Sequence, residues 1–180
     1  MKSRKWIPIL LEIWPYLVLV LLGLLLKQEN QRSGLVLFLL IVMTAAVYIL
    51  NIANACMGKR EDTRELALTD MLIKLIHIPF YLVIFVLGLL TLLIMVVPVF
   101  SFISPMIVTM LAIIDYFLML TSSAYGINAL IRARKEEIIS TNFMVLHIVM
   151  HLCFVLDIIS AIIIYMKLKK SKTIKNNRTK

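Results

Sequence analysis

Uncharged, apolar stretches alternate with short polar segments along most of the chain. Three of them, at about 6–26, 35–56 and 79–97, come close to the roughly 20 residues that a helix needs to cross a bilayer core. A fourth stretch covers about 105–131 and a fifth covers about 138–166. This pattern predicts an all-α fold, a polytopic transmembrane bundle of about five helices.

The segment before the third stretch, residues 65–78, has a different pattern. Asp70, Lys74 and His77 fall within about 60° of one another on a helix that turns by about 100° per residue. Pro79 suits the first turn of a new helix, where its missing N–H leaves no bond unmade. We therefore expect a short interfacial helix before the third span, in which Lys74 and His77 need not be buried.

The composition agrees with a membrane location. Of the 180 residues, 62% are hydrophobic and 16% are charged, whereas about 25% of the residues in an ordinary soluble domain are charged. We expect a single transmembrane domain over residues 1–166. The basic, polar tail at 167–180 is expected to be disordered.

The net charge of +9 comes from 19 basic and 10 acidic residues, which are concentrated between the apolar stretches. Basic loops of this kind lie beside anionic lipid head groups. The basic tail has no interleaved aromatic side chains for stacking on bases, so we expect no nucleic acid partner. The two cysteines, Cys56 and Cys153, form no CxxC motif, and no cofactor or metal is expected.

The distribution of basic residues leaves the topology open. Five spans divide the basic residues outside the spans equally, nine on each side. The side of the N-terminus would hold Lys2, Arg4, Lys5, Lys59, Arg60, Arg64, Arg132, Arg134 and Lys135, and the other side Lys27, Arg32, Lys167, Lys169, Lys170, Lys172, Lys175, Arg178 and Lys180. If the last segment is instead re-entrant or interfacial, the tail joins the first side and the count becomes sixteen against two.

Ionisable groups inside the spans are candidates for function because they are costly in a membrane. Glu12 is an ion or proton ligand, or a carboxylate that reaches the interface or pairs with Lys74. Asp115 has no basic neighbour in sequence. It is therefore protonated, hydrogen-bonded or paired with another helix.

The fifth stretch contains His147 and His151, which point the same way on a helix, and Asp115 on an antiparallel neighbour would lie nearly level with them. A His–His–Asp cluster could bind a metal or relay protons, although satisfied interhelical hydrogen bonds would explain it equally. Asp157 lies roughly opposite the histidines on a continuous helix. Because polar groups on two faces do not suit lipid, this helix should lie between neighbours.

Small and polar residues in two other spans predict helix contacts. In the second span, Thr44, Tyr48 and Asn51 share a stripe with Ala55, and such groups commonly join membrane helices. In the fourth span, Ser122 and Gly126 form a small-xxx-small pair that permits close approach.

The sequence carries no nucleotide-binding loop, GxSxG or HExxH motif. The stretch from Met71 to Tyr81, together with Asp115-Tyr116 and the segment from Ser122 to Gly126, resembles small, uncharacterised multi-pass proteins of Gram-positive bacteria. The resemblance implies a bacterial cytoplasmic membrane and carries over no activity.

We expect a small transport-related or accessory subunit of a membrane complex, with the lipid bilayer and a membrane protein or a second copy of the chain as partners. Two alternatives remain open. One is a membrane-embedded enzyme that uses His147, His151 and Asp115, with or without a metal. The other is an immunity-type or purely structural membrane protein.

Overall fold

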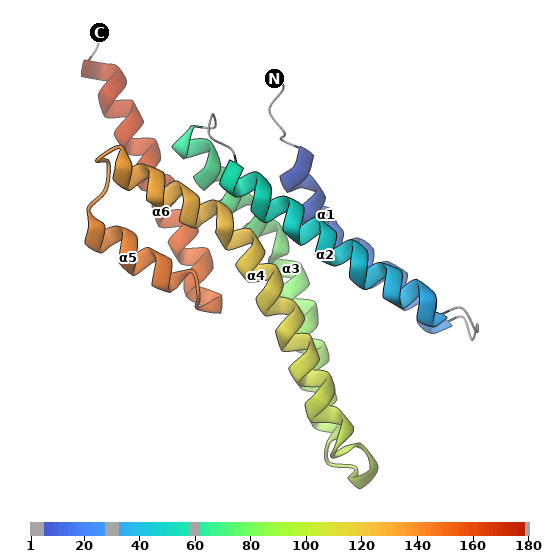
Figure 1. Ribbon diagram of the computed structural model, residues 1–180. Helices are drawn as coiled ribbons and strands as arrows, with labels where there is room; N and C mark the ends of the chain where they lie inside the picture. Colours follow the sequence, from blue (N-terminus) through green and yellow to red (C-terminus); the bar gives the residue numbers. More distant parts are fainter. Residues whose placement is uncertain (1–5, 28–32, 58–61, 179–180) are drawn as a thin grey trace.

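The computed structural model describes residues 6–27, 33–57 and 62–178, and this part of the chain contains helices and no strands (Figure 1). In chain order they are α1 (Trp6–Lys27), α2 (Ser33–Met57), α3 (Thr63–Ile94), the short 3-10 helix η1 (Pro98–Phe100), α4 (Ile103–Lys135), α5 (Thr141–Met150) and α6 (Phe154–Arg178). The predicted all-α helical bundle is confirmed.

Helices α1 to α4 correspond to the first four predicted spans. Within the described residues these four helices are long and apolar enough to cross a membrane. Their outer surfaces carry large apolar side chains that the rest of the chain leaves uncovered, such as Val20 of α1, Phe38 of α2 and Leu93 of α3, which are 62%, 64% and 69% exposed. So much exposed apolar surface is unfavourable in water and suits lipid or an apolar partner.

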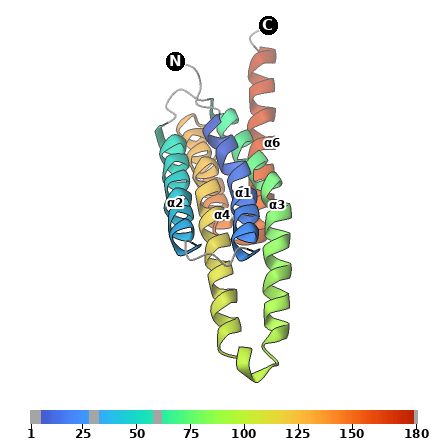
Figure 2. The same cartoon turned by 90° about the vertical axis from the view of Figure 1, so that its right-hand side faces the viewer.

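The bundle is built from helical hairpins (Figure 1). The hairpins α1–α2 and α3–α4 diverge toward their tips, and Figure 2 shows that α3–α4 extends further. Helices α3 and α4 pack against each other over much of their length. Helix α3 also contacts α1 and α6, and α4 also contacts α2, α5 and α6. The core therefore lies where α3 and α4 meet the other helices.

The expected surface helix and third span form one helix, α3, so the prediction of a separate interfacial helix is wrong. The Asp62 side chain accepts a hydrogen bond from the backbone N–H of Arg64 at the N-terminus, and the helix continues through Pro79. A proline in a helix leaves a carbonyl one turn earlier without its usual donor. For Pro79 this carbonyl is that of Leu75, and the Tyr16 hydroxyl of α1 donates a hydrogen bond to the next carbonyl along the helix, that of Ile76. Membrane helices tolerate proline where neighbouring helices and local adjustments of the backbone satisfy the freed groups.

The predicted fifth span is not one helix, because the chain breaks at residues 151–153 between α5 and α6. The turn is closed by short-range bonds from Leu152 N–H to the Val149 carbonyl and from Cys153 N–H to the Met150 carbonyl. The turn lies near the middle of α4, and α6 then runs back toward the end of the bundle where α5 began (Figure 1). The stretch is thus a helical hairpin that enters and leaves the bundle on the same side.

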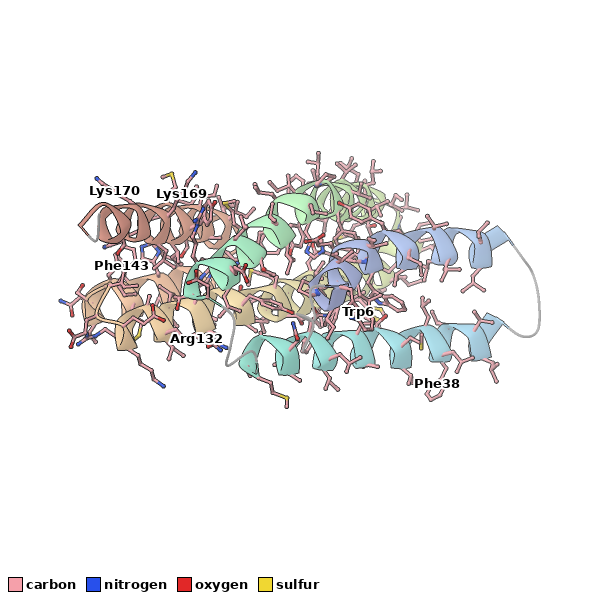
Figure 3. All side chains as sticks on the ribbon, turned by 90° about the horizontal axis from the view of Figure 1, so that it is seen from above. Trp6, Phe38, Arg132, Phe143, Lys169 and Lys170 are labelled. Carbon is pink, nitrogen blue, oxygen red and sulfur yellow. The ribbon has the colours of Figure 1, made fainter. Side chains whose placement is uncertain are left out.

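The tail was expected to be disordered, yet α6 continues to Arg178. Residues 167–178 contain no proline or glycine, and lysine is a good helix former that also complements the negative end of the helix dipole. Residues 179–180 lie outside the described part. Figure 3 shows Lys169 and Lys170 on the flank opposite to Phe38 of α2.

The predicted contacts of the second span are confirmed. Trp14 of α1 donates from Nε1 to the Thr44 hydroxyl at 3.0 Å. The Tyr125 hydroxyl of α4 donates to Asn51 Oδ1 at 3.0 Å and accepts from Asn54 Nδ2 at 3.2 Å. These bonds fix α2 between α1 and α4.

Candidate functional site

Two charged residues of α3 lie at the centre of the bundle. Asp70 and Lys74 are one helical turn apart, and the Lys74 ammonium lies 2.8 Å from Asp70 Oδ1. Their side chains are 1% and 0% exposed. The polar stripe that the sequence suggested should face the membrane surface therefore faces the interior. A charge removed from water needs a partner, and the α5–α6 hairpin supplies it.

The hairpin contributes His151 and Asp157. On an unbroken helix, residues six positions apart are separated by about 240° around the axis and about 9 Å along it. Here His151 Nδ1 lies 2.5 Å from Asp157 Oδ1, because the turn at 151–153 folds the chain back. The predicted placement of Asp157 opposite the histidines is wrong for the same reason. Its predicted burial between neighbouring helices is confirmed, since the residue is 2% exposed.

Lys74, His151 and Asp157 form a closed triangle of polar atoms. Lys74 Nζ lies 2.5 Å from Asp157 Oδ1 and 2.8 Å from His151 Nδ1. If the lysine donates to Nδ1, that nitrogen is unprotonated and cannot donate to Asp157. If Nδ1 instead carries a proton, it donates a hydrogen bond to Asp157, and it can no longer accept a hydrogen bond from the lysine. The triangle thus admits two hydrogen-bond patterns that differ in the position of a proton.

Helix α4 closes the site with small residues. The Ser123 hydroxyl donates to Asp157 Oδ1 at 3.0 Å. A Cβ atom added to Gly126 would lie 2.5 Å from Asp70 Oδ2 and 2.6 Å from His151 Nε2, closer than real contacts allow. Gly126 is therefore needed for α4 to approach both side chains, and the predicted close contact at this small residue is confirmed.

Besides Asp70 Oδ1, which has the Lys74 ammonium at 2.8 Å, two atoms of this cluster have no hydrogen-bond partner in the described part of the chain. They are Asp70 Oδ2 and His151 Nε2, which face each other across 4.0 Å above Gly126. Both residues are almost fully buried. Buried polar groups are normally paired, and an exception points to a proton, an ion or a water molecule that binds there. We call Asp70, Lys74, His151 and Asp157 the ionisable cluster.

The predicted cluster of Asp115 with both histidines does not form. His147 Nδ1 lies 2.7 Å from the Ser160 hydroxyl, which satisfies it within the α5–α6 hairpin. Asp115 instead lines a cavity between α3 and α4. The described residues contain no group of three His, Cys, Asp or Glu side chains that could hold a metal ion.

Glu12 of α1 lies outside the ionisable cluster and is partly buried. The Lys74 ammonium is engaged by Asp70 and Asp157, so it does not serve as the partner considered for Glu12. The neighbouring Leu11 carbonyl instead lies 3.1 Å from His77 Nε2. Polar groups of α3 thus face α1 as well as α6.

Sequence reasoning missed Asp70 and Lys74 as site residues. The available signal was their spacing of four positions, which places them on the same face as His77. We assumed that Pro79 begins a new helix, and this assumption placed the face in the membrane surface. A continuous helix carries the same face into the core, where opposite charges four residues apart pair with each other.

The comparisons with known proteins give a family and no activity. No curated protein and no solved structure matches this chain. The profile of one family matches residues 3–171, which is most of the 180 residues. The chain therefore belongs to DUF6652, a family of unknown function.

Proposed function

We propose that the protein is a multi-pass protein of a cell membrane that takes part in transport by passing protons through the ionisable cluster. The observation that carries the proposal is the triangle of Lys74, His151 and Asp157, which is buried within the bundle and admits two proton positions. Ionisable groups at membrane depth commonly belong to ion pathways and proton relays.

The depth of the cluster supports this role. Lys74 is 11 positions after Thr63, the first residue of α3. At 1.5 Å per residue it lies about 16 Å along the helix, which is about half the thickness of a bilayer core of about 30 Å. The helix break at 151–153 lies beside it. Interrupted helices are tolerated at this depth where protein covers them or where they line a polar path.

A purely structural ion-pair network explains the cluster less well. A network that serves only for stability gains most when every donor and acceptor is satisfied. In the described residues Asp70 Oδ2 and His151 Nε2 remain without partners, although they lie 4.0 Å apart. A proton or a small cation that moves between Asp70 and His151 would use both atoms.

The hairpin also favours one membrane topology. Four spans followed by a re-entrant hairpin place the N-terminus and the C-terminus on the same side. The basic residues outside the spans are then divided sixteen against two, which agrees with the positive-inside rule. Figure 3 shows Arg132 of α4 on the same flank as Lys169 and Lys170 of α6.

Epitope tags at both ends test the topology. In right-side-out vesicles we expect neither tag to bind antibody, and in inverted vesicles we expect both to bind it. Tags on opposite sides would contradict the re-entrant hairpin and support five spans.

Proton flux into proteoliposomes tests the function. We expect purified protein to acidify the lumen when a membrane potential is imposed, and we expect Asp157→Asn to reduce the rate at least tenfold. Glu12→Gln, which alters a carboxyl group outside the ionisable cluster, should keep the rate. No flux in the unaltered protein, or equal flux in Asp157→Asn, would contradict the proposal.

A second candidate is an accessory subunit of a larger membrane complex, favoured by the length of the α3–α4 hairpin. Helix α3 has 32 residues and spans about 48 Å, longer than a bilayer core of about 30 Å. Its apolar tip therefore requires a strong tilt or a partner that covers it. Purification in mild detergent followed by native mass measurement tests this candidate, and a stable partner or homo-oligomer would support it.

A further inference from the structure

A cavity of about 460 Å³ lies between α3 and α4, on the side of Tyr81 away from the α3 N-terminus. It falls in the volume range of small-molecule sites, about 300 to 1,000 Å³. Its walls are mostly apolar and aromatic, and they include Phe85, Tyr116 and, from α6, Phe154. The rings of Tyr81 and Phe154 pack edge to face, with centroids 4.8 Å apart. The cavity is thus shaped by rigid side chains from three helices.

Two polar groups of this cavity have no partner in the described part of the chain. Asp115 is 8% exposed and Tyr81 is 9% exposed, and both line the cavity. Asp115 Oδ1 and the Tyr81 hydroxyl oxygen are buried without a hydrogen bond. A carboxyl group left unpaired in apolar surroundings costs free energy, and a donor that enters the cavity would offset this cost.

We propose that this cavity binds a lipophilic organic cation, with its ammonium group on Asp115 and its apolar body between α3, α4 and Phe154. The carboxylate supplies the opposite charge and a hydrogen-bond acceptor. The faces of Tyr81, Tyr116 and Phe154 favour a cation further through their π electrons. The site is separate from the ionisable cluster, so the proposal does not depend on proton transfer there.

A lipid acyl chain fits these observations less well. An acyl chain would fill the apolar volume and leave the acceptor of Asp115 unpaired, and a carboxylate repels the anionic head groups of membrane lipids. A cation with an apolar body satisfies both the walls and the polar group.

Three probes with the same adamantane body separate charge from shape. They are 1-adamantylammonium, 1-adamantanol and adamantane-1-carboxylate, titrated calorimetrically into purified protein in micelles and corrected with protein-free micelles. We expect saturable binding of the ammonium compound at least tenfold tighter than that of the alcohol, and no binding of the carboxylate. Equal binding of alcohol and ammonium, or no saturable binding of any probe, would overturn the proposal.

Two substitutions locate the site. Asp115→Asn removes the charge, and we expect it to weaken ammonium binding at least tenfold. Gly88→Leu fills the cavity and keeps the carboxyl group, because Gly88 lines the cavity and a Cβ there meets nothing within 4 Å. It should weaken binding of every probe that the unaltered protein binds.

Matched controls guard against effects on folding. Gly23 of α1 also has open space around its Cβ, and it lies outside the cavity. We expect Gly23→Leu and Glu12→Gln to bind the ammonium probe like the unaltered protein. If Gly88→Leu and Asp115→Asn bind the ammonium probe as tightly as the unaltered protein does, the cation binds elsewhere and the proposal is wrong.

Discussion

The two parts of the α3–α4 hairpin are held together in different ways. Near the ionisable cluster, α3 and α4 are surrounded by other helices, and buried polar side chains such as Lys74 and Ser123 bond to Asp157 of α6. Toward the tip, the two helices pack mainly on each other, and residues such as Leu93 and Phe102 are exposed. The comparison teaches that specific polar contacts position the first part, whereas the second depends on its apolar surroundings.

Asp157→Leu should give the largest loss of stability. It removes the Asp157 carboxylate, which forms an ion pair with the fully buried ammonium group of Lys74. Breaking a buried ion pair by removing one partner costs about 3–5 kcal/mol. We expect a marked loss of monodisperse protein in detergent and a lower thermal midpoint. Normal yield and midpoint would show that the cluster does not hold the hairpin in place.

Gly126→Ala should have the next largest effect. The added methyl group would lie 2.5 Å from Asp70 Oδ2 and 2.6 Å from His151 Nε2, so the cluster must shift. Overpacking of this kind typically costs about 1–3 kcal/mol. Thermal unfolding checks this expectation. Gly23→Ala is the control, and it should be neutral or stabilising because its Cβ meets nothing within 4 Å.

Tyr125→Phe should destabilise the protein less, by about 1–2 kcal/mol. The change removes the hydroxyl that links Asn51 and Asn54 of α2 to α4 and leaves two buried amides without this partner. Thermal unfolding of Tyr125→Phe, of Asn51→Leu and of the double variant measures the coupling. A double variant that loses as much as the sum of the single changes would contradict a direct contact.

Asp115→Leu should change the stability least, by less than about 1 kcal/mol in either direction. Asp115 Oδ1 has no hydrogen-bond partner in the described part of the chain, and a leucine side chain suits the apolar walls of the cavity that Asp115 lines. An aspartate-to-leucine change can therefore be compared in the two regions by measuring the thermal unfolding of Asp115→Leu and Asp157→Leu under the same conditions. Similar losses for both would remove the contrast between the regions.

The apolar pattern predicted most of the fold. Four long apolar stretches became α1 to α4 because length and hydropathy decide whether a helix suits a membrane. The pattern did not reveal the break at 151–153, because neither proline nor glycine marks it. The turn is stabilised by contacts with α3 and α4, such as those of His151 and Asp157, which are distant in sequence.

The candidate site was predicted in part. His151 and Asp157 were recognised because ionisable residues are unusual in apolar stretches. Their contact could not be derived, because a continuous helix would place them on different faces. Asp70 and Lys74 were assigned to the membrane surface, since Pro79 is a strong local signal for a helix start. The tertiary contact of Tyr16 with the Ile76 carbonyl, in the helical turn before Pro79, has no counterpart in local sequence.

The central claim is that the ionisable cluster exchanges a proton inside the membrane. Infrared difference spectroscopy of the protein in lipid, recorded while the pH is stepped, detects the carbonyl stretch of a protonated carboxyl group directly. We predict a reversible carboxyl band that is lost in Asp157→Asn or Asp70→Asn and retained in Glu12→Gln. A spectrum in which neither cluster substitution removes a band would contradict the account.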